Sequence, residues 1–214
     1  MPHDPAAGKN GQKEKKKRLA GNASPPEPSP KAAKRDDIGR PANRLEIARA
    51  ADTILVRVIG LGSVNNAGAF SDFAAQALED GWRRIALDLS ECRGLDSTFL
   101  GTVVGISQEI AEAPAGGKEG WVCVVNASAA NRELFEIVGA DRYVRFKASV
   151  QMKPIETEPL AAGLMSTEKR LELVRRAHEN LVSIDARNES RFGEFLKCLA
   201  AELAKGGDEP ARSP

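Results

Sequence analysis

This 214-residue chain has few of the residues that build disulfide-linked or metal-bound structures. Its three cysteines, Cys92, Cys123 and Cys198, are an odd number without a C-x-x-C pair, and there are only two histidines. Such usage is typical of reduced thiols in a cytoplasm and argues against both a disulfide framework and a zinc site. We therefore expect a cytoplasmic protein without a bound metal.

Long hydrophobic runs are missing as well. No stretch approaches the ~18 uninterrupted apolar residues that a membrane span needs, and no apolar segment follows the basic start of the chain as in a signal peptide. With 42% hydrophobic and 29% charged residues, the composition indicates one globular domain plus an appendage and no membrane span.

Aromatic residues make up only 5% of the chain, and none precedes Phe70. Residues 1–42 instead hold seven of the twelve prolines and ten basic against five acidic side chains, so the formal net charge of +1 combines a +5 segment with a −4 remainder. Because this segment has almost no apolar surface to bury, we expect a disordered basic tail. Its cluster KEKKKR has no aromatic residues around it, so we interpret it as solvated and do not expect nucleic-acid binding.

The pattern changes at residue 43 to alternating strands and helices, which predicts an α/β domain over residues 43–150. The first two predicted strands should pair antiparallel at the edge of the sheet. The result is a single domain with a mixed β-sheet of four to five strands and packed helices. Strands are predicted at 45–49, 53–59, 84–89, 121–125 and 143–146, and helices over 70–78, 100–111 and 134–138.

A helical extension follows a predicted linker at 151–163. Apolar residues recur at helical spacing over 164–206, which predicts one long helix or a helical hairpin, and we expect 207–214 to be disordered. The apolar stripe from Phe192 to Leu203 either packs on the domain or forms a homodimer or partner surface. His178 lies among charged residues, so we expect a solvated helix position, with a phosphoacceptor histidine as the alternative.

The most informative stretch, LDLSECRGLDSTFLG at residues 87–101, joins a predicted strand to the next helix. It places Asp96, Ser97 and Thr98 where a loop enters a helix at the carboxyl end of a strand, the edge at which open α/β sheets present ligands. Free backbone N–H groups and the helix dipole stabilise an added phosphate there. Ser97 and Thr98 are therefore candidate phosphorylation sites. In the structural alternative, Asp96 or Ser97 simply caps the helix.

In this setting the run resembles the STAS domain of bacterial anti-sigma-factor antagonists. In that family an Asp at a strand end is followed eight residues later by an Asp-Ser-Ser/Thr phosphosite and a Gly-Leu-Gly helix start, and Asp88 and Asp96 have this separation. The resemblance covers about residues 45–147. It implies phosphorylation at Ser97, with Thr98 as second choice, by an anti-sigma factor that is also a serine kinase, and resetting by a serine phosphatase. The implied partner-binding residues are Asp96, Ser97, Thr98, Phe99 and Leu100. Phe99 replaces the first Gly of the motif and should put an apolar ring on the switch surface.

These features predict an anti-sigma-factor antagonist, a non-catalytic protein-binding switch that regulates transcription through phosphorylation. One alternative keeps the fold as a constitutive STAS scaffold or a sensory subunit of a signalling or transporter assembly that is not phosphoregulated. The other is a small flavodoxin-like enzyme that uses Asp96 and Ser97. The enzyme is disfavoured because no G-x-S-x-G elbow is present and His178 is predicted to lie far outside the domain, which leaves Ser97 without a base. Gly60 and Gly62 do not form a G-x-G-x-x-G site, so we expect no cofactor.

Overall fold

A computed structural model describes residues 43–113, 119–148, 156–161 and 163–206. All of them belong to one compact unit, Gly39–Pro214. The predictions for the basic tail and for the last eight residues fall outside the described residues.

The described residues form seven strands, five α-helices and one 3-10 helix. The strands are β1 (Arg44–Ala50), β2 (Thr53–Gly62), β3 (Arg84–Asp88), β4 (Cys92–Leu95), β5 (Trp121–Val125), β6 (Arg145–Lys147) and β7 (Glu158–Leu160). The helices are α1 (Val64–Glu79), α2 (Ser97–Glu112), α3 (Ala129–Ile137), η1 (Ala140–Arg142), α4 (Thr167–Ile184) and α5 (Arg187–Gly206).

The sheet is mixed, which confirms the predicted α/β fold. Its strand order is β6-β5-β3-β2-β1-β7, with β4 paired to the end of β2. Strands β2, β3, β5 and β6 run parallel, whereas β1 is antiparallel to β2 and to β7. The strand count exceeds the predicted four to five because β4 and β7 have only four and three residues, too few to leave a periodic pattern.

The first two strands pair antiparallel as predicted, but they do not form the edge of the sheet. Strand β7 lies beyond β1, with Leu45 of β1 opposite Leu160, and it comes from the segment predicted to be a linker. At the opposite edge, the strand predicted at 143–146 begins two residues later, because Tyr143 still belongs to the end of η1.

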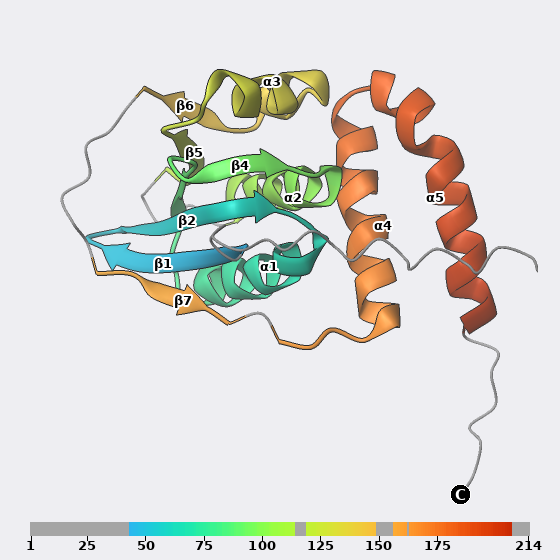
Figure 1. Cartoon of the computed structure of the whole chain (residues 1–214), viewed down its shortest axis with the longest axis horizontal. Helices are drawn as coiled ribbons and strands as arrows, with labels where there is room; N and C mark the ends of the chain where they lie inside the picture. The colour runs from blue at the N-terminus through green and yellow to red at the C-terminus, as the bar shows by residue number, and fades with distance from the viewer. Residues whose placement is uncertain (1–42, 114–118, 149–155, 162, 207–214) are drawn as a thin grey trace, which may run out of the picture. The chain divides into compact units, whose positions relative to one another are not determined.

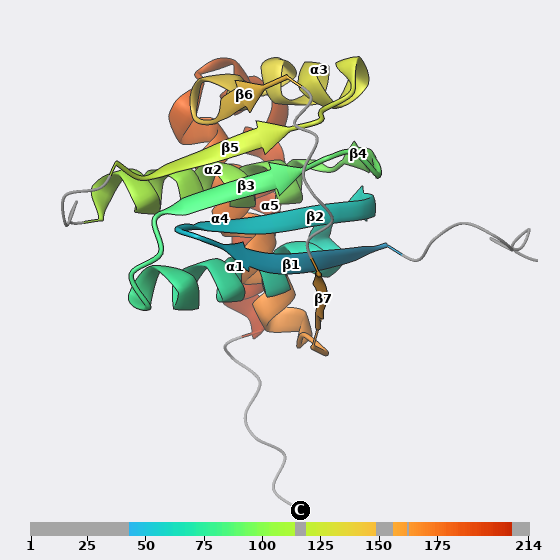
Figure 2. The same cartoon turned by 90° about the vertical axis from the view of Figure 1, so that its left-hand side faces the viewer.

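The helices form successive layers on the sheet. Helices α1 and α2 pack against it, α4 packs across α2, and α5 packs on α4. Figure 1 shows α5 on the side of α4 away from the sheet, and Figure 2 shows the sheet in front with α1, α2, α4 and α5 behind it. Helix α2 is therefore enclosed between the sheet and α4, and most of its residues are buried.

Two stacked phenylalanine rings lie at the centre of the core. The rings of Phe70 in α1 and Phe99 in α2 have centroids 5.6 Å apart, and neither side chain has any exposed surface. Burial of a ring this size contributes a large share of the apolar area that stabilises a domain.

Truncation of this ring pair should therefore be costly. We expect Phe99→Ala to lower the free energy of unfolding by ~3–5 kcal/mol, the usual cost of a large cavity in a packed core. Phe195→Ala is the control: this ring in α5 is 43% exposed, and its loss should cost about 1 kcal/mol or less. Urea unfolding followed by circular dichroism measures both, and equal losses would contradict the assignment of Phe99 to the core.

Candidate functional site

The carboxylate of Asp96 joins the first turns of two helices. Its Oδ1 accepts a hydrogen bond from the N–H of Phe99 at 2.8 Å, and its Oδ2 accepts one from the N–H of Val64 at 2.9 Å. Asp96 is thus the N-cap of α2 and at the same time satisfies an N–H at the start of α1. The cap that the sequence offered as an alternative is present, and it orients Ser97, the next residue in the chain.

A buried carboxylate holds the end of β3, the strand that precedes β4 and α2. Asp88 is 1% exposed and accepts hydrogen bonds from Arg57 Nε at 3.1 Å, Asn126 Nδ2 at 2.9 Å and the N–H of Ser90 at 3.1 Å. Burial alone would raise the pKa of Asp88, but the bonds from Asn126, Ser90 and Arg57 together outweigh it and lower the pKa. The carboxylate therefore stays charged and ties β3 to its neighbouring strands.

The Ser97 hydroxyl contacts a histidine from the C-terminal extension. Its Oγ lies 2.9 Å from Nε2 of His178, whose Nδ1 lies 2.8 Å from the carbonyl oxygen of Val174. A carbonyl only accepts hydrogen bonds, so Nδ1 carries the proton and, in the neutral ring, Nε2 accepts the bond from Ser97. The half-buried candidate phosphosite is thus hydrogen-bonded to α4.

The prediction that His178 is a solvated helix position is wrong. The side chain is 5% exposed, and its ring lies 4.9 Å from the rings of both Phe192 and Phe195 in α5. A signal was available in the sequence: His178 lies four residues after Val174 and three before Leu181, which places it on the apolar stripe of α4. The charged neighbours of His178 concealed that position.

Two glycines of α2 bring α4 close enough for this contact. A Cβ on Gly101 would lie 2.1 Å from the carbonyl oxygen of Ala177, and one on Gly105 would lie 2.4 Å from Nδ2 of Asn180. Asn180 Nδ2 also donates to the carbonyl of Gly101 at 3.1 Å. Glycine permits such an approach because it has no side chain. The sequence analysis missed this pair, whose signal is the spacing of four residues in GTVVG.

Only part of the predicted partner surface is accessible. Asp96 and Ser97 are half-buried at the start of α2, but Thr98 is 5% exposed, Leu100 is 2% exposed and Phe99 is fully buried. The expectation of an apolar Phe99 ring on the switch surface is therefore wrong, and Leu100 does not lie on a surface either. The physical reason is the enclosure of α2, which the sheet covers from one side and α4 from the other.

The apolar stripe of α5 faces the rest of the chain over part of its length. Phe192 packs against the core and Leu199 is 7% exposed, whereas Phe195 is exposed over nearly half its surface. Of the two interpretations of this stripe, packing on the domain accounts for Phe192 and Leu199.

Within the described ranges, no group of His, Cys, Asp and Glu side chains is arranged to hold a metal ion, and no helix is long and apolar enough to cross a bilayer.

The family model of the STAS domain matches residues 44–152, and the chain belongs to this family. No curated protein matches the chain.

Several solved structures are similar to about half of the chain. A putative anti-sigma factor antagonist from Thermotoga maritima is 21% identical over 50% of this chain and 87% of its own, with a TM-score of 0.43. SpoIIAA of Bacillus in its phosphorylated form is 16% identical over 50% of this chain and 92% of its own, with a TM-score of 0.41. An anti-sigma factor antagonist from Mycobacterium paratuberculosis is 20% identical over 48% and 82%, with a TM-score of 0.40.

The lowered pKa of Asp88 predicts how stability depends on pH. A carboxyl group whose pKa falls on folding stabilises the fold fully above its ordinary pKa of 3.8, and this contribution is lost as the pH falls through the lower pKa of the folded state. We expect Asp88→Asn to cost ~1–3 kcal/mol at pH 7, and the difference from the wild type to shrink on acidification below about pH 4. Urea unfolding at a series of pH values measures the free energy of unfolding of both proteins. A difference between them that stays constant as the pH falls would contradict the prediction.

Proposed function

We propose that the chain is an anti-sigma-factor antagonist, a cytoplasmic protein-binding switch without catalytic activity that is controlled by phosphorylation of Ser97. The observation that carries this proposal is the position of Ser97, which directly follows the N-cap Asp96 in the first turn of α2. Membership of the STAS family and the spacing of Asp88, Asp96 and Ser97 described above support it.

The charge change at this position is large. A phosphate adds about −1.5 to −2 charges, and the first turn of a helix stabilises it through free N–H groups and the helix dipole. The same charge lies next to the Asp96 carboxylate, whose oxygens already accept bonds from both helix starts. A partner that docks through acidic or apolar contacts at this corner is repelled once Ser97 carries a phosphate.

The partner in this proposal is an anti-sigma factor that is also a serine kinase. The unmodified chain binds it and releases a sigma factor, which changes transcription. The kinase then transfers the γ-phosphoryl group of ATP to Ser97 Oγ: a P–O bond forms to Oγ, the bond to ADP breaks, and the hydroxyl proton leaves to a base of the kinase. A serine phosphatase hydrolyses the phosphoserine and resets the switch.

Mass spectrometry and binding test this function. Protein from the native host should contain a species 80 Da heavier, with the added mass located on Ser97. In pull-downs, Ser97→Ala should retain a serine-kinase partner, and Ser97→Asp should lose at least about tenfold in affinity through the added charge. Ser90→Ala, at an exposed serine between β3 and β4, is the control. Equal affinity of the Ala and Asp variants for the same partner would contradict the switch.

A constitutive STAS scaffold or sensory subunit is the second candidate, and the cover over Ser97 favours it. A hydroxyl that is hydrogen-bonded to a buried histidine is shielded from a kinase. In this case the chain assembles with a signalling or transporter complex, or with a second copy through α5, and Ser97 carries no phosphate in the host. The two candidates differ in the host mass spectrum and in the response to Ser97→Asp.

The Ser97–His178 pair also requires a test for nucleophilic catalysis, because a base does lie beside Ser97. In catalytic triads a carboxylate orients the histidine, whereas here Nδ1 of His178 bonds a carbonyl of its own helix, and Phe192 and Phe195 flank the ring. We therefore expect a fluorophosphonate probe to leave Ser97 unlabelled in the folded protein. A stoichiometric adduct that Ser97→Ala abolishes would contradict the non-catalytic assignment.

A further inference from the structure

We propose that α4 and α5 form an intramolecular cover over Ser97, and that this cover and a phosphate on Ser97 exclude one another. Phosphorylation then releases α4 from α2 and exposes the apolar faces of both helices. The contact itself is independent of the proposed function; only the phosphate as natural trigger rests on it.

The first argument is the space around the Ser97 hydroxyl. Phosphorylation replaces the hydroxyl hydrogen with phosphorus and three acceptor oxygens, and Ser97 Oγ lies only 2.9 Å from the imidazole of His178. It also removes the proton that Ser97 donates to Nε2. The bond from its other nitrogen to Val174 and the packing of its ring against Phe192 and Phe195 oppose a local rotation of His178. The phosphate is therefore accommodated by displacement of the helix.

The second argument is the closeness of the two helices below this contact. The backbone of Ala177 lies directly against Gly101, and the side chain of Asn180 lies against Gly105. Rigid packing of this kind is bistable rather than continuously deformable, so small local shifts are amplified. A displacement at His178 thus separates α4 from α2 instead of slightly widening the gap between the two helices.

The third argument is that the two helices do not close completely beside the glycines. A pocket of about 170 Å³ that is open to solvent lies between α2 and α4. The residues that line it have less apolar surface to expose when α4 is released, which lowers the cost of release. Its lining includes Thr102, Gly105 and Glu109 from α2 and Leu173, Arg176 and Asn180 from α4.

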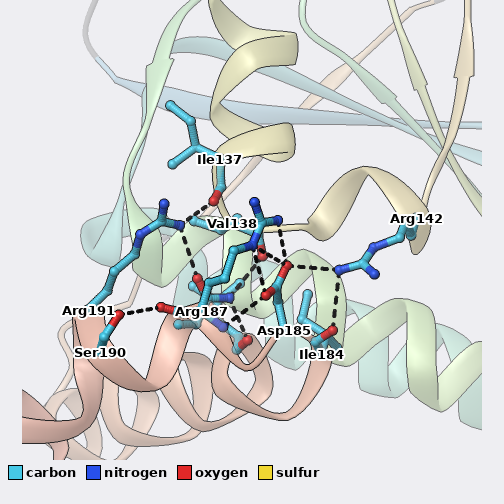
Figure 3. A network of polar contacts seen from close by, with 10 residues as sticks. Ile137, Val138, Arg142, Ile184, Asp185, Arg187, Ser190 and Arg191 are labelled. Atoms are coloured by element: carbon cyan, nitrogen blue, oxygen red, sulfur yellow. Dashed lines mark hydrogen bonds and ion pairs between the residues drawn. The ribbon is translucent and has the colours of Figure 1, made fainter.

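The corner between α4 and α5 is tied to the domain elsewhere, so the cover remains attached when it opens. Figure 3 shows Asp185 between Arg142 of η1, at 3.0 Å, and Arg187 of α5, at 2.7 Å. Hydrogen bonds from Arg187 hold the pKa of Asp185 well below its ordinary range.

A buried amide strengthens this anchor. Asn188 Nδ2 donates to the carbonyls of Val138 at 2.9 Å and Leu181 at 2.7 Å, and Arg191 bonds the carbonyl of Ile137. At the other end of the extension, β7 pairs with β1. Helix α4 is therefore tethered on both sides of the face that contacts Ser97.

Hydrogen exchange followed by mass spectrometry tests the cover in the full-length chain. Phosphoserine is installed at position 97 by genetic incorporation, which needs no kinase, and phosphoserine at the exposed position 90 is the matched control. We expect at least about tenfold faster exchange in residues 167–184 with phosphoserine at 97, and no change in β3 and β5. The control should behave as the unmodified protein.

A second variant opens the cover without a phosphate. Gly101→Ala places a methyl group against the carbonyl of Ala177, while alanine by itself favours the α2 helix. It should raise exchange in α4 as phosphoserine does. Gly193→Ala in α5 is its control, because the added Cβ meets only the flexible side chain of Glu189.

Protected α4 amides in the phosphoserine-97 protein would overturn the proposal, whatever Gly101→Ala does. Fast exchange throughout the sheet would also overturn it, because the proposed change is confined to the extension. If host protein lacks phosphate on Ser97 but installed phosphoserine opens α4, the phosphorylation switch is wrong and the cover stands. If Ser97 is phosphorylated in the host and α4 stays protected, the cover is wrong and the switch stands.

Discussion

The carboxylate of Asp96 is the constraint on which the site depends. By accepting bonds from the N–H groups of Val64 and Phe99, it caps α2 and joins the first turn of α1 to the first turn of α2. The next side chain, Ser97, has its hydrogen-bond partner on another element. That element is α4, through His178. A single cap thus determines the position of the candidate phosphosite and the contact that covers it.

Helix α2 is enclosed on two sides, so its side chains must fit both neighbours closely. Its sheet side carries Phe99 stacked on Phe70, and its other side carries the glycines that receive α4. A helix buried on both sides cannot present a broad docking face, so access to its first turn depends on α4. The C-terminal extension is therefore part of the site, even though it lies beyond the residues that match the STAS family.

The sequence predicted elements with strong periodicity and failed where a neighbour decides the outcome. The apolar runs at 84–89 and 121–125 and the stripe of α1 identified the sheet and its first helix, because burial on a regular element leaves a regular pattern. Helix α1 begins six residues before its first aromatic, since a capping box at Ser63 and small residues start it without an apolar stripe. His178 had the correct spacing, but nothing local indicates that α2 and two phenylalanines of α5 cover it. Contacts of this kind join segments that are far apart in the sequence, and the pattern of one segment does not indicate which other segment covers it.

The cover lowers the apparent affinity of the proposed switch for its partner. A partner that needs the first turn of α2 competes with the chain's own α4, so its apparent dissociation constant is the intrinsic one divided by the open fraction. Because linkage is reciprocal, every contact that holds α4 down weakens the partner by the same factor. A substitution that opens α4 without adding charge at Ser97, such as Gly101→Ala, strengthens partner binding, whereas a phosphate on Ser97 opens α4 but also repels a partner at the first turn of α2. The glycines at 101 and 105 belong to the STAS domain, whereas Ala177, His178 and Asn180 belong to the extension. The contacts between the STAS domain and the extension therefore set the open fraction of α4, and with it the apparent dissociation constant of the partner. In a STAS domain without the extension, no helix competes with the partner in this way.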